Sequence, residues 1–441
     1  MSHTAEQHVL GNGLRTIISS AQTIPTVAVC LMVGAGSSHD LPGRHGLAHM
    51  AEHVRMAGTS AALGPGGYLQ LMHGNGVMVN AGTGNDATMW FQVAEPGSVE
   101  LGLWALADRL GASLAQVDQN TLHIQRAIIG QEKFQVFDSQ PYGSTQARLL
   151  AQLFPAGHPY HHHSIGSAAD LAAITLQDVV DFLTARYVPA NMTLAIVGDI
   201  TAGKALELAD RYLGALPAAK PPHAVVHERL RALDSPRRVE VPEEADCSRV
   251  VAGFRLPVNS LDAHAEILAA ALAMHALAEG PTSRLYNTLV RSAQLATGVT
   301  QRVAPHMGGA SIGWITVDVV PGLSPDPVCD MLAEQLDRVA AQGFTDAEVA
   351  RAKALTEAET LSTESSHLDR AQQLANVGQS FGQAGSDALD ELLADMAGHQ
   401  VDRFNAVAPE RVHRAADDWL ASEHAAVIAF HTSSDTSDIE E

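Results

Sequence analysis

The chain has 441 residues and a mass of 46.5 kDa, a length that favours two or three domains over one. Apolar residues make up 46% of the chain and charged residues 17%, which is enough apolar material for large cores. Lys and Arg total 27 against 49 Asp and Glu, and the resulting net charge of −22 argues against a nucleic-acid partner and against binding to an anionic membrane.

The cysteines and the apolar segments indicate in which cellular compartment the protein is expected. Cys30, Cys247 and Cys329 lie far apart and form neither a CxxC pair nor a disulfide framework. Residues 1–7 lack an apolar signal core, and no apolar stretch reaches the roughly eighteen residues that cross a bilayer. We therefore expect a cytoplasmic protein without a membrane partner.

The first half of the chain alternates strands and helices. A hairpin is predicted around the turn Gly11-Asn12-Gly13. The pattern then predicts, in chain order, a strand at 26–33, a helix at 46–56, strands at 77–81 and 88–93, helices at 98–114, 119–135 and 176–186, and a strand at 192–197.

The second half resembles a faint copy of the first. A strand at 249–256 runs into a helix at 263–277, and a last strand at 427–430 corresponds to the one at 194–197. A chance similarity is the alternative. We predict an α+β fold in which two similar αβ-sandwich domains each combine a mixed, mainly antiparallel sheet with helices packed on one face.

The prolines between Gly214 and Pro236 indicate a linker near the middle of the chain. The predicted boundaries are an N-terminal domain at 1–216, a linker at 217–238, a C-terminal domain at 239–432 and a disordered acidic tail at 433–441.

One short motif carries chemistry, His49-Met50-Ala51-Glu52-His53. On a helix, His49 and His53 lie one turn apart on one face, so both imidazoles can bind one ion. Glu52 lies beside that face and can take a proton from a metal-bound water without being a ligand. This HxxEH order is the inverse of the HExxH zinc-protease motif. The alternative is a surface helix with two histidines and a solvated glutamate.

A catalytic zinc site needs a third protein ligand. Glu132 is the best candidate, because helical spacing stacks it with Ile124 and Ile128 on a face that should be buried, where a carboxylate needs a cation. A slightly rotated helix that brings Glu132 to water is the alternative. Glu100 and Asp108, on the preceding helix, are rival ligands.

Further short motifs run along nearly the whole chain. In order they are Leu10-Gly11-Asn12-Gly13-Leu14, Gly46 to His53 followed by Ala57-Gly58-Thr59, Asn80-Ala81 with Thr83 and Thr88, Leu103-Trp104 with Ala107 to Leu110, Gln125-Arg126 through Glu132, Pro141-Tyr142-Gly143, Gly157-His158-Pro159-Tyr160, Ile165-Gly166, Val197-Gly198-Asp199 and Ser283-Arg284-Leu285-Tyr286. Together they resemble the pitrilysin/insulinase family of inverted-motif zinc peptidases, which includes the mitochondrial processing peptidase. The ordered set is far more specific than HxxEH alone.

The resemblance implies that His49, His53 and Glu132 bind one Zn²⁺ per chain, with Glu52 as the general base. It makes the N-terminal domain the catalytic one and the C-terminal domain non-catalytic. It also implies that the two domains form one half of a clam-like chamber.

The resemblance further implies that a peptide substrate adds as a strand to the sheet edge near Asn80 and Ala81, a mode that rests on backbone groups and size. The family's glutamate seven residues before the third ligand is Gln125 here. That position lies just behind the metal ligands, where an amide keeps the hydrogen bonding but loses the charge, so we expect it to tune the site.

A second departure concerns the partner. Active family members often carry an Arg and a Tyr seven residues apart after the second-half SRLY, but Val290 and Thr297 occupy those positions here. We therefore predict a heterodimer with a homologous chain that supplies the Arg/Tyr pair, with a homodimer as the alternative. The histidines at 158 and 161–163 are expected to form a solvated loop in preference to a second metal site.

Three functional hypotheses follow. The leading one is a zinc metallo-endopeptidase subunit that hydrolyses peptides or unfolded segments. The second is a non-catalytic binding or scaffold subunit of the same fold, although its metal set would be expected to have degenerated. The third is a protease dedicated to a precursor peptide in cofactor biosynthesis.

Overall fold

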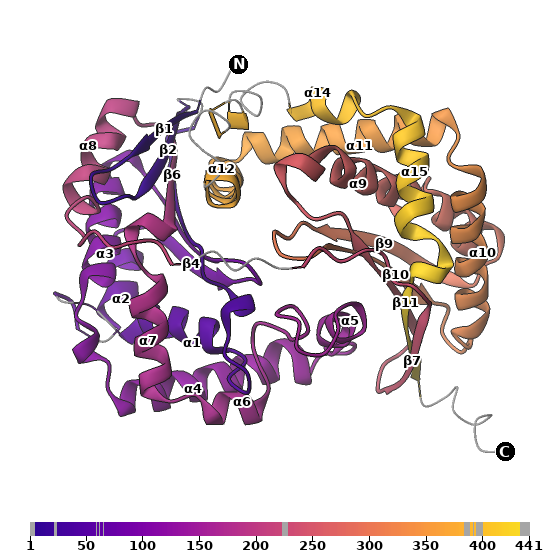
Figure 1. The fold of residues 1–441 in the computed structure, drawn as a ribbon, viewed down its shortest axis with the longest axis horizontal. Coiled ribbons are helices and arrows are strands. Elements are labelled where there is room, and N and C mark those ends of the chain that lie inside the picture. The colour runs from indigo at the N-terminus through magenta and orange to yellow at the C-terminus, as the bar shows by residue number, and fades with distance from the viewer. Residues whose placement is uncertain are drawn as a thin grey trace. The chain divides into compact units, whose positions relative to one another are not determined.

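The computed structural model describes residues 5–21, 24–58, 60, 62–64, 66–222, 228–382, 389–390, 392–393 and 400–432. The predicted tail at 433–441, Thr59 of the signature and residues 223–227 of the predicted linker lie outside them. The chain forms two compact units (Figure 1), each built from three segments. The first comprises Met1–Lys133, His162–Val225 and Leu361–Gln400, and the second comprises Phe134–His161, Val226–Thr360 and Val401–Glu441.

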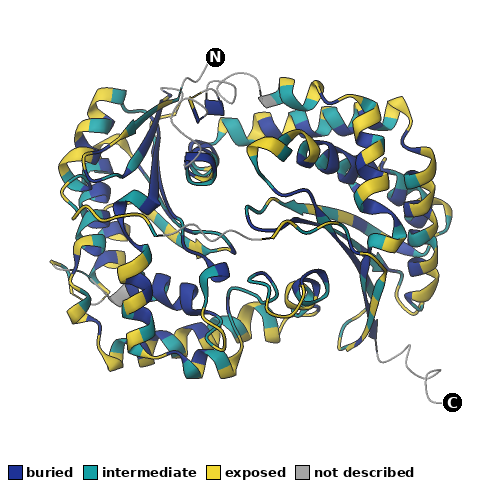
Figure 2. Cartoon of the chain, in the orientation of Figure 1, coloured by how far each residue is buried: buried dark blue, intermediate teal, exposed yellow. Residues whose placement is uncertain are grey.

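The first unit contains a six-stranded sheet in the order β1-β2-β6-β3-β5-β4. Its strands are β1 (Glu6–Val9), β2 (Arg15–Ser20), β3 (Val27–Val33), β4 (Met78–Thr83), β5 (Thr88–Ala94) and β6 (Met192–Gly198). The β2–β6 pair is parallel and every other neighbouring pair is antiparallel. Strands β3 and β6 are buried at every position (Figure 2), because both faces of the sheet are covered.

The helices of the first unit are α1 (Leu47–His53), α2 (Gly67–Gly74), α3 (Val99–Gly111), α4 (Gln119–Lys133), α6 (Ala168–Ala173), α7 (Leu176–Arg186), α8 (Ala202–Tyr212) and α12 (His367–Phe381). Helices α2 and α3 pack on one face of the sheet, where their Tyr68, Met72 and Ala105 form one cluster with Ala94 of β5. The prediction that helices cover only one face is wrong, because both faces are covered. Helix α12 covers the opposite face, where its Leu374 packs with Ala28 and Cys30 of β3. The second face therefore has one helix, and it comes from the second half of the sequence.

The second unit repeats this sheet. Its strands are β7 (Arg237–Glu243), β8 (Arg249–Leu256), β9 (Ala296–Ala304), β10 (Ser311–Val319) and β11 (Ala426–Thr432), in the order β7-β11-β8-β10-β9. Only β7–β11 is parallel among these pairs. The order matches β2-β6-β3-β5-β4 strand for strand, so the predicted α+β fold with two similar domains is confirmed.

The helices of the second unit are α5 (Thr145–Leu153), α9 (His264–Ala278), α10 (Asp326–Gln342), α11 (Asp346–Ser365, which continues into the first unit), α14 (Gln400–Asn405) and α15 (Pro409–Leu420). Helix α9 packs against Val250 and Phe254 of β8, whereas α5 packs against Val251 on the other face. Helix α5 comes from the first half of the sequence. The two halves thus exchange one sheet-covering helix each.

Helix α9 corrects one expectation from the sequence. The helical segment Leu261–Ala278 is 18 residues long with a mean hydropathy of 1.3, so one helix of the described residues is long and apolar enough to cross a bilayer. Half of that segment is buried within the structure, and Leu272, Met274 and Leu277 are fully enclosed between the sheet and α15. An all-round apolar helix is what the core of a unit this size requires.

Candidate active site

Helix α1 begins at a position that only glycine fills comfortably. Gly46 has φ of 95°, and a Cβ there would lie 2.9 Å from the carbonyl oxygen of Ile165. The side chain of Asp40, six residues upstream, satisfies the first amides of the helix. Its two oxygens accept hydrogen bonds from the backbone N–H of Gly46 at 2.7 Å and of Ala48 at 2.8 Å.

His162 supports this cap. Its Nε2 lies 3.2 Å from the Asp40 carboxylate and 3.1 Å from the carbonyl oxygen of Ser37, and its ring stacks on His45 with centroids 3.8 Å apart. Burial raises the pKa of the Asp40 carboxyl, and the hydrogen bonds from His162 and the two amides oppose that rise. The middle histidine of the tract therefore fixes the helix that carries His49 and His53.

Three side chains converge on one point in the first unit. His49 Nε2 and His53 Nε2 are 3.2 Å apart, and Glu132 Oε2 lies 3.7 Å from the first and 3.4 Å from the second. A tetrahedral zinc with metal–ligand distances of about 2.0–2.2 Å separates its ligand atoms by roughly 3.3–3.6 Å, so the donor set fits that ion. Within the described residues, no other group of three His, Cys, Asp or Glu could hold a metal.

The protonation of the two imidazoles differs. Burial, and then the neighbouring His53, lowers the pKa of His49 to about 4, which keeps its ring neutral and available as a ligand. Burial also opposes protonation of His53, but the hydrogen bond to Glu132 and the nearby Glu52 outweigh it and raise its pKa. The hydrogen bond to His53 holds the pKa of Glu132 below its usual range.

Gln125 lies where the resemblance puts it. It is buried on α4, and its Oε1 is 3.4 Å from His53 Nδ1. Accepting the Nδ1 proton leaves Nε2 of His53 free for a metal. Gln125, Ile129 and Glu132 form the stripe of α4 that faces inward.

One argument for Glu132 is wrong. Ile124 and Ile128, expected to share its buried face, are each 45% exposed. Helix α4 is turned so that the stripe of Gln125, not the stripe of the isoleucines, faces α1, where Gln125 contacts His53. The rivals are engaged elsewhere: Glu100 pairs with Arg211, and Asp108 accepts the Ser60 hydroxyl.

Glu52 lies beside these three side chains but does not belong to the group that could hold a metal. It is 5% exposed, and its Oε2 accepts a hydrogen bond from Thr83 Oγ1 at 2.6 Å. Burial raises the pKa of the Glu52 carboxyl, opposed by that hydrogen bond and by His53. A raised pKa is the property that a carboxylate needs in order to act as a general base near neutral pH.

Asn80 and Ala81 lie on β4, the last strand of the first sheet. Its side chains alternate between exposed and half-buried, and its outer edge is open to an added strand among the described residues. Asn80 Oδ1 accepts the Ala81 N–H at 2.8 Å, so one amide on this strand is satisfied by a side chain.

The histidine tract is not the solvated loop that the sequence predicted, because His161, His162 and His163 are half-buried and each contacts a different group. His161 Nδ1 lies 2.8 Å from the carbonyl oxygen of Phe154, while His163 Nδ1 accepts the N–H of Ile165 at 3.1 Å. Because His162 contacts the Asp40 carboxylate, each of the three rings has a different partner. No sequence pattern predicts the Asp40–His162 contact, since the two residues are 122 positions apart.

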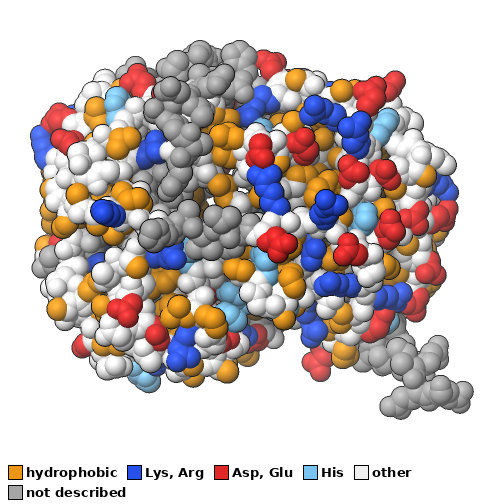
Figure 3. All heavy atoms as spheres, in the orientation of Figure 1, with side chains coloured by type: hydrophobic (Ala, Val, Ile, Leu, Met, Phe, Trp, Pro, Cys, Tyr) orange, Lys and Arg blue, Asp and Glu red, His pale blue; other side chains and the backbone are white. Residues whose placement is uncertain are grey.

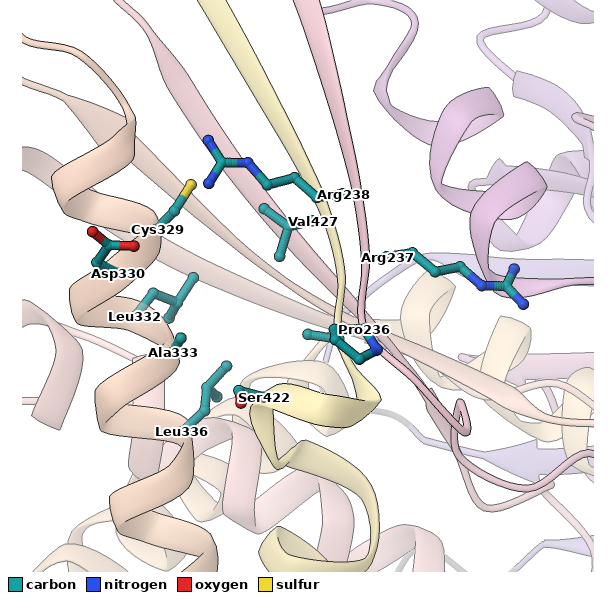
Figure 4. A pocket seen from close by; sticks show the side chains of 11 residues that line it. Pro236, Arg237, Arg238, Cys329, Asp330, Leu332, Ala333, Leu336, Ser422 and Val427 are labelled. Carbon is teal, nitrogen blue, oxygen red and sulfur yellow. The ribbon is translucent and has the colours of Figure 1, made fainter.

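The second unit has a cavity of its own. It holds about 350 Å³ between α10, β7 and β11, and none of the predicted site residues lines it. Cys329, Leu332 and Leu336 point from α10 toward the strands, whereas Arg237 points away (Figure 4). Burial raises the pKa of the Cys329 thiol to about 11, which makes it a poor nucleophile, and Arg238 is neutralised by Glu240 and Asp326. On the face in Figure 3, acidic and basic side chains are interspersed over this unit.

The chain matches known proteins over both halves. The family model described as Insulinase (Peptidase family M16) matches residues 15–160, and the model described as Peptidase M16 inactive domain matches residues 173–356. The zinc protease PqqE of Helicobacter pylori is 26% identical over 212 residues, which are 48% of this chain and 47% of that protein. Coenzyme PQQ synthesis protein F of Pseudomonas aeruginosa is 30% identical over 231 residues, which are 50% of this chain and 29% of that protein. Each of these two matches spans less than half the length of the relative.

The fold is shared over a longer span than the sequence. The crystal structure of a protease from Helicobacter pylori superposes with a TM-score of 0.84 and 20% identity, covering 97% of this chain and all of that one. Both family models, the ordered motifs and this shared fold agree. The chain belongs to the insulinase family of peptidases, family M16.

Proposed function

We propose that this chain is the zinc-binding, catalytic half of a metallo-endopeptidase that cuts peptides or unfolded segments. The observation that carries the proposal is the donor set of His49, His53 and Glu132, whose ligand atoms lie within 4.8 Å of one another, with Glu52 beside it. A structural role alone does not call for two imidazoles and a carboxylate around one point.

Each site residue has a separate role in the proposed reaction. His49, His53 and Glu132 would hold Zn²⁺, which supplies the Lewis acidity that activates a water and polarises the scissile carbonyl. Glu52 takes the proton of the attacking water and passes it to the leaving amine. Gln125 holds His53 in the tautomer whose Nε2 faces the metal.

The edge of β4 offers a place for the substrate. An extended peptide would add as a further antiparallel or parallel strand and use backbone hydrogen bonds, so recognition would depend little on side chains. A carbonyl of that peptide would replace Asn80 Oδ1 on the Ala81 N–H. The released Asn80 amide could then bind the peptide backbone.

A dedicated precursor protease is a second candidate. It is supported by the similarity to a protein named Coenzyme PQQ synthesis protein F. A non-catalytic scaffold role is supported by the match to an M16 inactive domain, but that match covers residues 173–356, beyond the HxxEH helix. We therefore favour catalysis in the first unit with a non-catalytic second unit.

We further propose that a homologous chain completes the enzyme. Val290 packs against the apolar core of the second unit, and Thr297 Oγ1 donates to the carbonyl oxygen of Asp318 at 3.3 Å. Arg291 is exposed beside Tyr286 and Asn287. None of these offers the Arg/Tyr pair, so a heterodimer is favoured over a homodimer.

The test is cleavage of an unstructured, internally quenched peptide by zinc-loaded chain, alone and mixed with a homologous chain that carries the Arg/Tyr pair but lacks HxxEH. Cleavage by the mixture should fall by roughly two to four orders of magnitude with Glu52→Gln, while zinc content stays the same. The exposed Glu95→Gln is the matched control. Equal cleavage by wild type and Glu52→Gln would overturn the catalytic proposal, and full activity of the isolated chain would overturn the heterodimer.

A further inference from the structure

The carboxylate proposed as the general base is held by a hydroxyl from the edge strand. Thr83 Oγ1 donates to Glu52 Oε2 at 2.6 Å, a short distance typical of an O–H donor on an ionised carboxylate. It is the only side-chain hydrogen bond to Glu52 among the residues that the structure describes. Because Glu52 is 5% exposed, water cannot readily replace this donor.

The Thr83 hydroxyl is itself directed by Thr88. The two threonines are directly opposite in the β4–β5 register, with their hydroxyl oxygens 3.2 Å apart. Thr88 is fully buried and donates its proton to the carbonyl oxygen of Ala35 at 2.7 Å. A threonine hydroxyl has one proton. With the Thr88 proton on Ala35, the Thr83 proton points to Glu52.

Thr83 binds Oε2, whereas no side-chain donor among the described residues binds Oε1. Rotation of the carboxylate is therefore restricted, and Oε1 is the oxygen with both lone pairs open to a proton. Thr83 follows Ala81 by two residues, so the two side chains share one face of β4. The strand that would align the peptide therefore also orients the base.

We propose that Thr83 is a positioning residue that orients Glu52 for proton transfer and couples this orientation to the strand that receives the substrate. The inference rests on the proposed function and extends it to a residue outside the metal-binding helix. The hydroxyl is what matters, so serine should substitute for threonine and the isosteric valine should not.

The kinetic test compares Thr83→Val and Thr83→Ser in the same peptide assay, with zinc measured in each. Thr83→Val should lower kcat by about 10- to 100-fold with KM and zinc content unchanged, because an oriented proton acceptor acts mainly in the transition state. Thr83→Ser should keep kcat within about threefold. Thr300→Val, the same change at an exposed site on β9, is the control. A wild-type kcat for Thr83→Val, or an equal loss for both variants, would overturn the proposal.

A second measurement does not depend on activity. Urea unfolding of Thr83→Val, Glu52→Ala and the double variant forms a double-mutant cycle. Thr83→Val should lower the folding equilibrium constant by about tenfold in wild type and much less in Glu52→Ala. If the two substitutions have additive effects on the free energy of unfolding, Thr83 and Glu52 do not interact, and the proposal is overturned. If no peptide is cleaved by any form, the proposed function fails, and the cycle still decides whether Thr83 orients Glu52.

Discussion

His162 holds the buried carboxylate of Asp40 against the first turn of the helix that carries His49 and His53. The contact gives the metal-binding helix a fixed start, although no capping residue directly precedes it: the N-cap is Gly46, which has no side chain. Positioning of the two imidazoles thus depends on residues that touch neither of them.

Removing this cap should weaken the helix start and the metal site together. Asp40→Asn keeps one acceptor oxygen but turns the other into an NH₂ group, which cannot accept an amide proton. We expect a loss of about 1–3 kcal/mol in the free energy of unfolding, measured with urea, together with weaker zinc binding. Asp417→Asn, exposed on α15, is the control. Unchanged stability would show that the cap contributes nothing.

The three converging side chains should account for the metal content. Protein purified without a histidine tag is expected to contain one zinc per chain by elemental analysis, and a His49→Ala/His53→Ala variant should contain none. The exposed His73→Ala should retain it. Equal zinc in the double variant and the wild type would place the ion elsewhere.

Zinc affinity should fall as the pH decreases. The slope of log affinity against pH should reflect the release of one proton when zinc binds. The pKa of His53 is raised, so part of its population is protonated near neutral pH and must lose that proton to bind zinc. His49, whose pKa is lowered to about 4, and Glu132, whose pKa is also lowered, add no competing proton in that range. In a chelator-competition titration between about pH 5.5 and 8, the plot of log zinc affinity against pH should have a slope near one at its acid end and should level off above the pKa of His53. A slope of two would mean that both imidazoles titrate together.

Gln125 should set the strength of the site through His53. Gln125→Ala removes the acceptor of the His53 Nδ1 proton and should weaken zinc binding roughly 10- to 100-fold. Gln125→Glu should bind zinc more tightly than wild type, since a carboxylate makes the imidazole more basic. Gln131→Ala, exposed on the same helix, is the control. If the alanine variant binds zinc as wild type does, Gln125 has no part in the site.

Local patterns predicted the local parts of this structure. The HxxEH spacing required a helix over His49 and His53, and the helical period placed Gln125 and Glu132 two turns apart on α4. The period could not say which face of α4 would be buried, because Ile124 and Ile128 form an apolar stripe that packing leaves at the surface. Apolar stripes are ordinarily buried, but here the inward face of α4 carries Gln125 and Glu132, which contact His53.

The contacts that escaped prediction join residues far apart in the sequence. Thr83 was visible only as part of a motif on β4, and nothing in that motif names Glu52 as its partner. The Asp40–His162 contact and the placement of α12 on β3 have no periodic signature at all. Such pairs follow from the topology of the sheet, which a faint internal repeat suggested but did not place in space.

The exchanged helices have a consequence for synthesis of the protein. Strands β3 and β6 are complete once residue 198 has been made, but α12, which covers Ala28, Cys30 and Ala195, starts only at His367. At about 5–20 residues per second, the ribosome needs on the order of 10–30 s to add the intervening residues. During that time one apolar face of the first sheet has no native cover. A nascent chain in this state is a natural client for chaperones, and native packing of this face must wait until α12 has been synthesised.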